Sequence, residues 1–351
     1  MHVPDGFINA PVSAVTGVVA AGAVAVSLRG ARRELDERTA PLAGLVAAFI
    51  FAVQMLNFPV AAGTSGHLLG GALAAILVGP FTGVLCVSVV LLMQGILFAD
   101  GGLTALGVNI TDMAIVTTVV SYAAFRGLVK VLPRKRRSVT VAAFVSALLS
   151  VPAAAVAFTL IYAVGGTTDV PIAKVATAMI GVHVLIGIGE AAITALTVGA
   201  VIAVRPDLVH GARGLQQRLR LRVNGELVDA PAATPAPAAA RSSHRKVWIT
   251  GLVTSLVLAG FVSFYASASP DGLEKVAKDK GIDTRTEKHA TEDSPLAGYG
   301  VKDVSDARIS GGLAGVIGVG VTVVAGSAVF WAVRRRRTSD GVSPSSTSQV
   351  A

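Results

Sequence analysis

The sequence predicts an all-α integral membrane protein: a bundle of seven helices, then a module of two helices joined by an extracytoplasmic loop. The first observation is composition, because 53% of the 351 residues are hydrophobic and only 15% are charged. The second is that the apolar residues form long segments, and about 20 such residues cross a bilayer as a helix. The third is that positive residues gather between these segments, as in cytoplasmic loops.

The apolar segments and the positive clusters together define the topology. The apolar segments cover residues 10–28, 41–62, 69–98, 105–125, 139–164, 172–204, 247–268 and 311–333. The positive clusters run from Arg29 to Arg38, Arg126 to Arg137, Arg205 to Lys246 and Arg334 to Arg337, and the positive-inside bias places all of them in the cytoplasm. The net charge of +9 then serves topology and contact with anionic lipid. The basic residues lack the interleaved aromatic residues of a nucleic-acid site.

The segment 69–98 is predicted to cross the membrane twice. An even number of crossings must separate the cytoplasmic loops 29–40 and 126–138, and segments 41–62 and 105–125 supply two of them. As one helix, 69–98 would be about 45 Å long, against a bilayer of about 30 Å. Gly79-Pro80 is the expected break. We therefore predict nine spans in the cell membrane, with the N-terminus outside and the C-terminus in the cytoplasm.

Four regions follow from this pattern: a seven-span module (1–204), a Pro/Ala-rich cytoplasmic linker (205–246), a two-span module (247–333) and a disordered cytoplasmic tail (334–351). The linker contains the extended sequence DAPAATPAPAAAR at 229–241. In the outer segment, Pro270 and Asp271 predict a helix start and Gly281 a helix stop, and we expect this segment to pack on the outer face of the large module. The one cysteine, Cys86, is expected to serve packing.

The start of the chain, Met1-His2, offers three nitrogens to one metal ion: the α-amine of Met1, and the backbone amide and imidazole of His2. Such a planar nitrogen set favours Ni(II) or Cu(II). The bulky His2 should protect Met1 from removal, and the absence of a basic n-region argues against a secretory signal. The sequence therefore predicts that Met1 and His2 bind a metal ion.

A second histidine, His67, lies on the same predicted face in AAGTSGHLLGG. Together with Met1 and His2 it completes four nitrogens, enough for a square-planar ion; the alternative is a loop histidine bonded to backbone. Asp100 and Asn109 follow in another outer loop and are candidates for the second shell of a ligating imidazole. Helix capping is favoured for Asp100, and both roles stay open for Asn109.

His183 and Glu190 are seven residues apart in the seventh predicted span and so share one face. Hydrogen bonding between helices is the favoured role, and a proton relay or second metal site is the alternative. The sequence has no GxxxxGK[ST] motif, no HExxH motif and no nucleophile–base pair. We therefore expect no enzyme activity, and energy for uphill transport must come from a partner or an ion gradient.

Four fragments in order resemble the CbiM/NikM family: MHVPDGF, AAGTSGHLLGG, QGILFADGGLTALGVN and GVHVLIGIGEAAIT. This family comprises substrate-capture (S) components of energy-coupling-factor (ECF) transporters, an ABC-type class, for cobalt and nickel. The resemblance covers about residues 1–204. SPDGLEKVAKDKG and SPLAGYG, within about 247–333, resemble the PDGLE module related to CbiN and NikN. Their fusion in one chain is similar to the NikMN arrangement and slightly favours nickel over cobalt.

The resemblance implies that the N-terminal segment enters the helical bundle from outside and that Met1, His2 and His67 bind the transported ion. It implies a coupling subunit of the CbiQ/NikQ type and ATPases of the CbiO/NikO type as partners, with no resident cofactor. The small module would help load the ion or arrange the N-terminal loop. The rival hypotheses are a proton-driven secondary metal transporter, which would need His183 and Glu190 as a relay, and a membrane metal sensor without transport.

Overall fold

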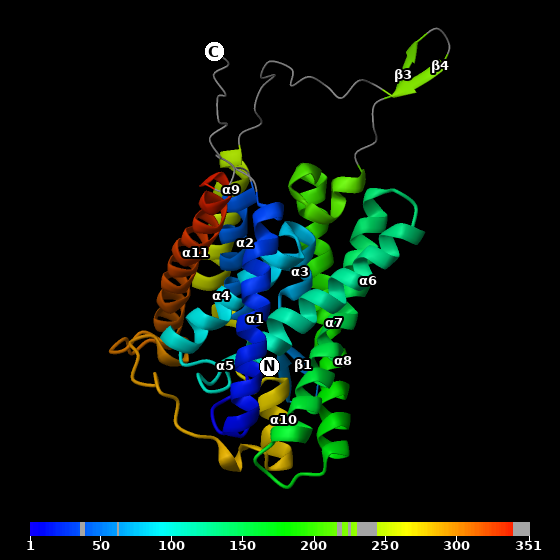
Figure 1. The fold of residues 1–351 in the computed structure, drawn as a ribbon. Helices are drawn as coiled ribbons and strands as arrows, with labels where there is room; N and C mark the ends of the chain where they lie inside the picture. The colour runs from blue at the N-terminus through cyan, green and yellow to red at the C-terminus, as the bar shows by residue number, and fades with distance from the viewer. Residues whose placement is uncertain (36–38, 62, 216–219, 224–225, 230–243, 340–351) are drawn as a thin grey trace, which may run out of the picture.

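The computed structural model describes the chain except for residues 36–38, 62, 216–219, 224–225, 230–243 and 340–351. Its helices are α1 (Ala10–Glu34), α2 (Thr39–Gln54), α3 (Gly71–Val78), α4 (Pro80–Leu97), α5 (Leu106–Asn109), α6 (Thr117–Val131), α7 (Arg136–Gly165), α8 (Ile172–Val204), α9 (His244–Gly260), α10 (Gly272–Lys280) and α11 (Ala307–Ser339). A π-helical stretch, Ile110–Val116, joins α5 to α6. Figure 1 shows a helical bundle with α10 at one end and the ends of α9 and α11 that adjoin the grey segments at the other. We call these the N-terminal end and the linker end.

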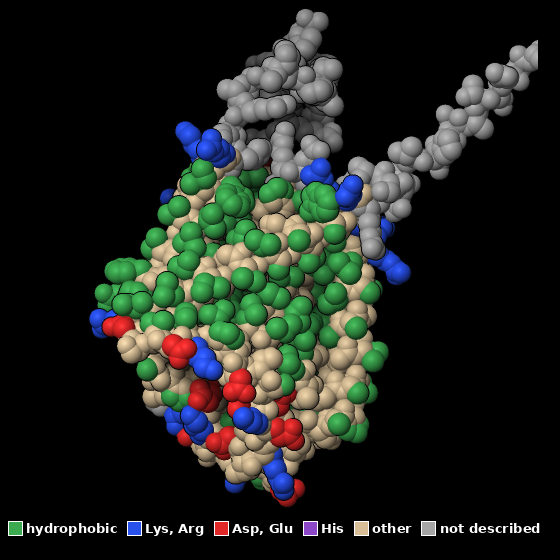
Figure 2. Space-filling model, turned by 90° about the vertical axis from the view of Figure 1, so that its left-hand side faces the viewer, with side chains coloured by type: hydrophobic (Ala, Val, Ile, Leu, Met, Phe, Trp, Pro, Cys, Tyr) green, Lys and Arg blue, Asp and Glu red, His purple; other side chains and the backbone are tan. Residues whose placement is uncertain are grey.

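The predicted class, an all-α membrane protein, is confirmed. Among the described residues, seven helices are long and apolar enough to cross a membrane: α1, α4, the continuous α5–α6, α7, α8, α9 with the turn after it, and α11. In the face shown in Figure 2, hydrophobic side chains form a broad band, and charged side chains lie beyond its two edges. This distribution is the one expected of a protein whose middle contacts lipid tails.

The other two predicted spans are shorter than expected. The apolar segment 41–62 is helical only to Gln54 and then forms the strand β1 (Phe58–Ala61), which pairs with β2 (Thr64–Gly66). The helix α3 has only 8 residues, about 12 Å of rise. The residues before it are extended because, as described below, side chains rather than helix bonds satisfy their backbone groups. Non-helical backbone at this depth is tolerated only where protein surrounds it, and Leu68 and Leu69 are fully buried.

The predicted break at Gly79-Pro80 is confirmed and shows where α3 ends. Gly79 has φ 104° and Pro80 begins α4. The Glu34 carboxylate, at the end of α1, accepts hydrogen bonds from the backbone N–H groups of Phe81 (3.2 Å) and Thr82 (2.7 Å). Since α1 ends at the linker end, α3 also reaches that end and α4 returns. The segment 69–98 therefore runs to the linker end and back, as predicted, and the helix of its outward leg, α3, has about half the expected length.

The C-terminal module packs along the large bundle. The helix α11 lies against α2, where Gly44 leaves room for Ser327: an added Cβ would lie 2.4 Å from Ser327 Oγ. At the N-terminal end, α10 begins after its N-cap Asp271 and ends at Gly281, which has φ 74°. Both predicted helix signals are thus confirmed. Gly272 admits α10 to α8, because an added Cβ would meet Ile186 at 2.7 Å.

The predicted linker and tail are more ordered in part than the sequence indicated. The linker begins with 3₁₀ turns at Pro206–Leu208 and His210–Leu215, and it includes the paired strands β3 (Arg220–Val223) and β4 (Glu226–Asp229). The proline-rich stretch lies almost wholly outside the described residues. The helix α11 continues to Ser339, so a disordered tail starting at residue 334 is wrong, and residues 340–351 lie outside the described part. Cys86 is buried and free.

Candidate metal site

The first residues of the chain are clamped at the N-terminal end of the bundle. The Val3 N–H donates to Asn109 Oδ1 at 2.7 Å, and Asn109 Nδ2 donates to the Val3 carbonyl at 3.1 Å. The Gly102 N–H donates to the same carbonyl at 2.9 Å. Asn109 therefore holds the backbone next to His2. This double clamp fixes where the residues before Val3 lie.

The turn after Val3 is fixed by Asp5. Its Oδ1 accepts hydrogen bonds from the Thr104 N–H at 2.8 Å and the Thr104 hydroxyl at 2.5 Å. Its carbonyl accepts from the Glu287 N–H at 3.0 Å, which ties the N-terminal segment to the C-terminal module. Gly6 has φ 88°, and an added Cβ would lie 2.1 Å from the Arg285 carbonyl oxygen. Both modules therefore shape the entry of the N-terminal segment.

The α-amine of Met1 is buried between two polar partners. Its nitrogen lies 2.7 Å from His67 Nε2 and 2.7 Å from Asp271 Oδ2. The residue Met1 is 3% exposed. His67 Nδ1 lies 3.0 Å from the Leu68 carbonyl oxygen, an acceptor, so the ring proton resides on Nδ1 and the lone pair of Nε2 faces the amine. The backbone contact expected of an ordinary loop histidine and the orientation expected of a ligand thus coexist in His67.

Glu190 positions the segment that carries His67. Its Oε2 and Oε1 accept hydrogen bonds from the N–H groups of Leu69 (2.7 Å) and Gly70 (3.1 Å), and Gln54 Nε2 donates to the Leu69 carbonyl at 3.0 Å. Glu190 is fully buried. Glu190 therefore joins α8 to the residues that lead into α3, and its partners are backbone groups that an extended segment would otherwise leave unsatisfied.

We expect Glu190→Gln to weaken ion binding about 10- to 100-fold, the range typical of residues that orient a metal ligand. The amide keeps the volume of the carboxylate but turns an N–H donor towards one of two backbone donors, so the segment with His67 loses its fixed position. Isothermal titration with Ni(II) measures the change. Thr194→Val, one turn further along α8, is the matched control, and equal losses in both variants would assign the effect to general packing.

The imidazole of His2 lies beside that of His67, with ring centroids 5.1 Å apart and planes inclined by 24°. His2 Nε2 lies 3.1 Å from Gln94 Oε1 and Nδ1 lies 3.4 Å from Asp100 Oδ1. Burial lowers the pKa of His2 to about 4, although Asp100 opposes this shift. The ring is therefore neutral at physiological pH. With the proton on Nε2 donated to Gln94, the lone pair of Nδ1 is available.

Asp100 does not cap a helix as expected, since the residue before α5 is Ala105. Its Oδ2 instead accepts the Tyr299 hydroxyl at 2.6 Å, so Asp100 lies between His2 and the C-terminal module. Gln94 is also in contact with His2 and was not predicted as a site residue. The only signal for it in the sequence was its place six residues before Asp100, in the same outer stretch.

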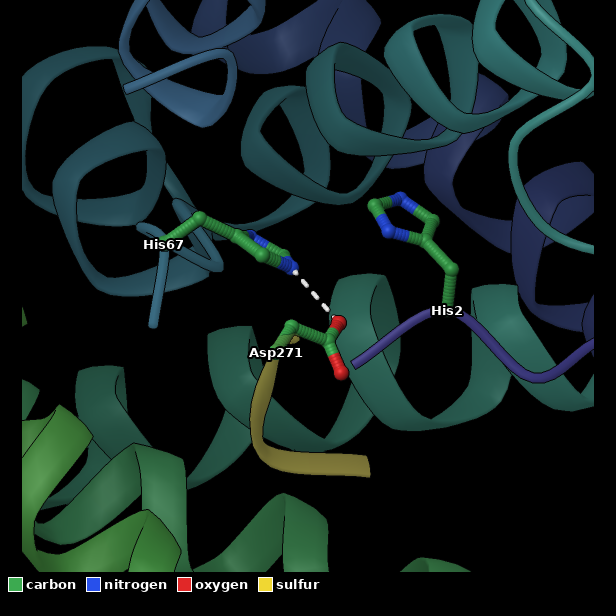
Figure 3. Close-up of side chains that lie close together, drawn as sticks. All are labelled: His2, His67 and Asp271. Atoms are coloured by element: carbon green, nitrogen blue, oxygen red, sulfur yellow. Dashed lines mark ion pairs between the residues drawn. The ribbon is translucent and has the colours of Figure 1, made fainter. Parts of the chain in front are cut away.

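The sequence also missed Asp271 as a site residue and assigned it to the helix start alone. Asp271 does cap α10, since its Oδ1 accepts the Glu274 N–H at 2.8 Å. Its other oxygen lies 3.6 Å from His67 Nε2, as Figure 3 shows with the three side chains converging on one space. Burial alone would raise the pKa of Asp271, but the Met1 ammonium and His67 outweigh it and hold that pKa well below its usual value. His2, His67 and Asp271 each offer one ligand atom, all within 4.8 Å of one another.

His183 shares the buried face of α8 with Glu190, as predicted, but it does not join another helix. Its Nδ1 donates to the Met179 carbonyl of its own helix at 2.7 Å. Its Nε2 has no hydrogen-bond partner within the described residues. The ring lies under α10, 3.2 Å from where a Cβ of Gly272 would stand. His183 thus packs beneath the candidate site.

A cavity of about 770 Å³ leads from the site to the surface between the two modules. His2, His67 and Asp271 line its inner part. Its outer part is lined by Glu274 and Arg308, which are exposed. The site is therefore buried yet connected to solvent at the N-terminal end. The N-terminal segment, the α2–α3 connection, the end of α4 with the loop after it, and the C-terminal module meet here, so neither module builds the site alone.

A multi-span helical bundle with a nitrogen-rich site near its N-terminus defines a membrane metal transport protein. The family described as cobalt uptake substrate-specific transmembrane region (CbiM) matches residues 2–208, and the PDGLE domain matches residues 245–335. The chain belongs to the CbiM family and carries a PDGLE domain fused to it. It is a component of cobalt/nickel transport.

Similar proteins agree with this assignment. A putative metal transport protein of Haloquadratum walsbyi is 39% identical over 60% of this chain and 93% of its own length. A putative fused nickel transport protein NikMN of Archaeoglobus fulgidus is 37% identical over 60% of this chain and 68% of its own length. A crystal structure of a truncated transition metal transporter aligns with a TM-score of 0.51 and 28% identity over 58% of this chain and 99% of that one.

Proposed function

We propose that the protein captures Ni²⁺ or Co²⁺ at the N-terminal end and passes it into the cell, with nickel slightly favoured. The ion would bind the α-amine of Met1, the amide nitrogen and Nδ1 of His2, and Nε2 of His67. The observation that carries the proposal is the free amine 2.7 Å from His67 Nε2. A planar ion with bonds of about 2.0 Å places adjacent nitrogens about 2.8 Å apart. The amine and His67 thus already have the separation of neighbouring ligands.

The surroundings support each ligand in the required state. Gln94 accepts the Nε2 proton of His2, and the Leu68 carbonyl accepts the Nδ1 proton of His67. Such partners fix the tautomer and the ring orientation of a ligating histidine. Asn109 fixes Val3 and hence the amide that precedes it. To receive an ion, the amine and the amide would each have to lose a proton.

We propose that transport is driven by separate partner subunits, a coupling subunit of the CbiQ/NikQ type and ATPases of the CbiO/NikO type. The sequence has no phosphate-binding loop, and the C-terminal module occupies a place beside the site, suited to closing it. The N-terminal end would face outside and the linker end the cytoplasm, because the positive clusters lie at the linker end. Glu190 is committed to backbone hydrogen bonds, which argues against a proton relay through α8.

The test uses the protein with a C-terminal tag, so that Met1 keeps a free amine. Titration with Ni(II) and Co(II) should show tight binding of one ion per chain. Cells that express the chain with coupling and ATPase subunits should accumulate the ion in an ATP-dependent way, and cells with an inactive ATPase should not. Uptake that stops when the proton gradient collapses while ATP is intact would contradict the proposal, as would absence of stoichiometric binding.

We expect the affinity for the ion to fall as the pH falls, by about tenfold per pH unit for each proton released. The amine and the amide must both lose a proton to bind. Because burial lowers the pKa of His2 to about 4, His2 is already neutral between pH 6 and 8 and adds no slope there. Titration at pH 6, 7 and 8 in buffers of different ionisation enthalpy counts the protons. An affinity that is constant over this range would exclude the amine and amide as ligands.

A further inference from the structure

The carboxylate of Asp271 belongs to the C-terminal module but lies at the ligands of the large module. Asp271 and Met1 are 270 positions apart in sequence, yet Asp271 Oδ2 is 2.7 Å from the amine of Met1. The placement is built and not accidental: Ser65 donates its backbone N–H to the Pro270 carbonyl at 2.8 Å and its hydroxyl to the Ser269 carbonyl at 2.7 Å. The residues just before Asp271 are therefore tied to β2, which leads directly to His67.

The distances allow one ion to reach the amine, His67 and Asp271 together. The triangle of Met1 N, His67 Nε2 and Asp271 Oδ2 has sides of 2.7, 2.7 and 3.6 Å. Its circumscribed radius is about 1.8 Å, shorter than a metal–nitrogen bond of about 2.0 Å. An ion bonded to the amine and to His67 can thus lie within bonding distance of the carboxylate as well.

The charge of the site points the same way. A doubly charged ion bound by an amine, a deprotonated amide and two neutral imidazoles carries a net charge of +1. The surroundings are largely buried, and an uncompensated charge there is costly. The carboxylate of Asp271 lies against the amine, where it offsets part of this charge, just as it offsets the Met1 ammonium when no ion is bound. Asp100 is a second carboxylate nearby, but it lies beside His2 Nδ1 at 3.4 Å and accepts the Tyr299 hydroxyl, so it does not contact the amine side of the site.

We infer that Asp271 is a fifth ligand of the transported ion, an oxygen outside the plane of the four nitrogens, so that the C-terminal module completes the coordination sphere. The inference rests on the proposed function, because it takes Met1, His2 and His67 as the planar ligands. It gives the fused module a chemical role: the ion is held fully only while α10 is docked on the large bundle. Undocking α10 would withdraw one ligand and one negative charge together.

The test compares Asp271→Asn with Glu274→Gln in the full-length, C-terminally tagged protein. Asparagine is as good an N-cap as aspartate, so α10 should keep its start while the anionic ligand is lost. Glu274→Gln removes one negative charge from the same helix and the same cavity, but from a side chain that pairs with Lys278 at 2.7 Å. The readouts are the dissociation constant for Ni(II), its visible spectrum and magnetic moment, and the ligand count from X-ray absorption.

We expect Asp271→Asn to bind Ni(II) about 10- to 100-fold more weakly, to lose one oxygen ligand and to shift towards the diamagnetic spectrum of four-coordinate planar nickel. Glu274→Gln should match the unchanged protein. An unchanged or tighter affinity in Asp271→Asn, or an identical spectrum and ligand count, would overturn the inference. His67→Ala separates the two levels: if it abolishes binding while Asp271→Asn does not, the proposed function stands and the fifth ligand falls. If neither variant weakens binding, both the proposed function and the assignment of Asp271 as a fifth ligand are wrong.

Discussion

A single residue added in front of Met1 should abolish high-affinity ion binding. The addition converts the α-amine into an amide, which binds a metal ion only after it loses its proton, and moves the free amine about 3.8 Å along the chain, away from His67. The structure leaves no room for a simple adjustment, because the nitrogen of Met1 is enclosed between His67 and Asp271 at 2.7 Å each. If the loss of one ligand and its chelate ring costs about 4 kcal/mol of binding free energy, binding would weaken about a thousandfold.

The measurement is a Ni(II) titration of the extended protein beside an unextended one, with the N-terminus of each verified by mass spectrometry. One residue added after Ala351 is the matched control, since it alters length at the other end of the chain. Without metal, the temperature of thermal unfolding should fall only modestly in the N-terminal variant, since the hydrogen bonds between Asn109 and Val3 stay intact. High affinity that survives the extension would remove the amine from the ligand set.

The sequence allowed the nitrogen ligands to be predicted, because those of Met1 and His2 depend on local chemistry and that of His67 depends on topology. A free amine followed by histidine chelates whatever the fold, and His67 followed from topology, which placed its loop on the same face. The structure brings Met1, His2, His67, Asp100 and Asn109 together, although their roles towards an ion stay predictions. The position of Asn109 shows the limit of that reasoning. Its clamp on the Val3 backbone depends on how a non-helical segment enters the bundle.

Asp271 could not be assigned to the site from sequence, for a physical reason. Its local signal, a carboxylate before a short helix, is fully accounted for by capping, and α10 confirms that role. Its second role exists only because the C-terminal module docks on the large bundle, through contacts such as Ser65 with Pro270. Two helix modules joined by a long linker can dock in many ways, and hydropathy contains no information on which one.

The length of α3 was the main error in the predicted fold. Hydropathy indicated an apolar segment and parity required it to run out and back. The segment does reverse at Gly79-Pro80, but neither observation distinguishes helix from extended backbone. The difference comes from Glu190 and Gln54, which satisfy the backbone groups of Leu69 and Gly70. A buried carboxylate on one helix thus permits another segment to remain unwound. That unwound segment is what brings His67 to the site.

The second large effect is expected from His67→Ala, which should also abolish high-affinity binding. The variant removes the nitrogen that faces the amine and leaves three ligands from one short segment. The backbone around it should hold, because Glu190 and Gln54 form hydrogen bonds with the backbone of Leu69 and Gly70. A Ni(II) titration measures the loss. His210→Ala is the control: this histidine contacts Tyr122, at the linker end of the bundle.

Chemical rescue makes the prediction for His67 specific. Truncation to alanine leaves a space the size of an imidazole, and that space adjoins the cavity of about 770 Å³ that reaches the surface. Free imidazole should therefore enter it and restore Ni(II) binding to His67→Ala in a saturable way. It should not restore binding to the protein extended before Met1, because the missing ligand there is the amine. Rescue of both proteins, or of neither, would argue that His67 acts through the fold and not as a ligand.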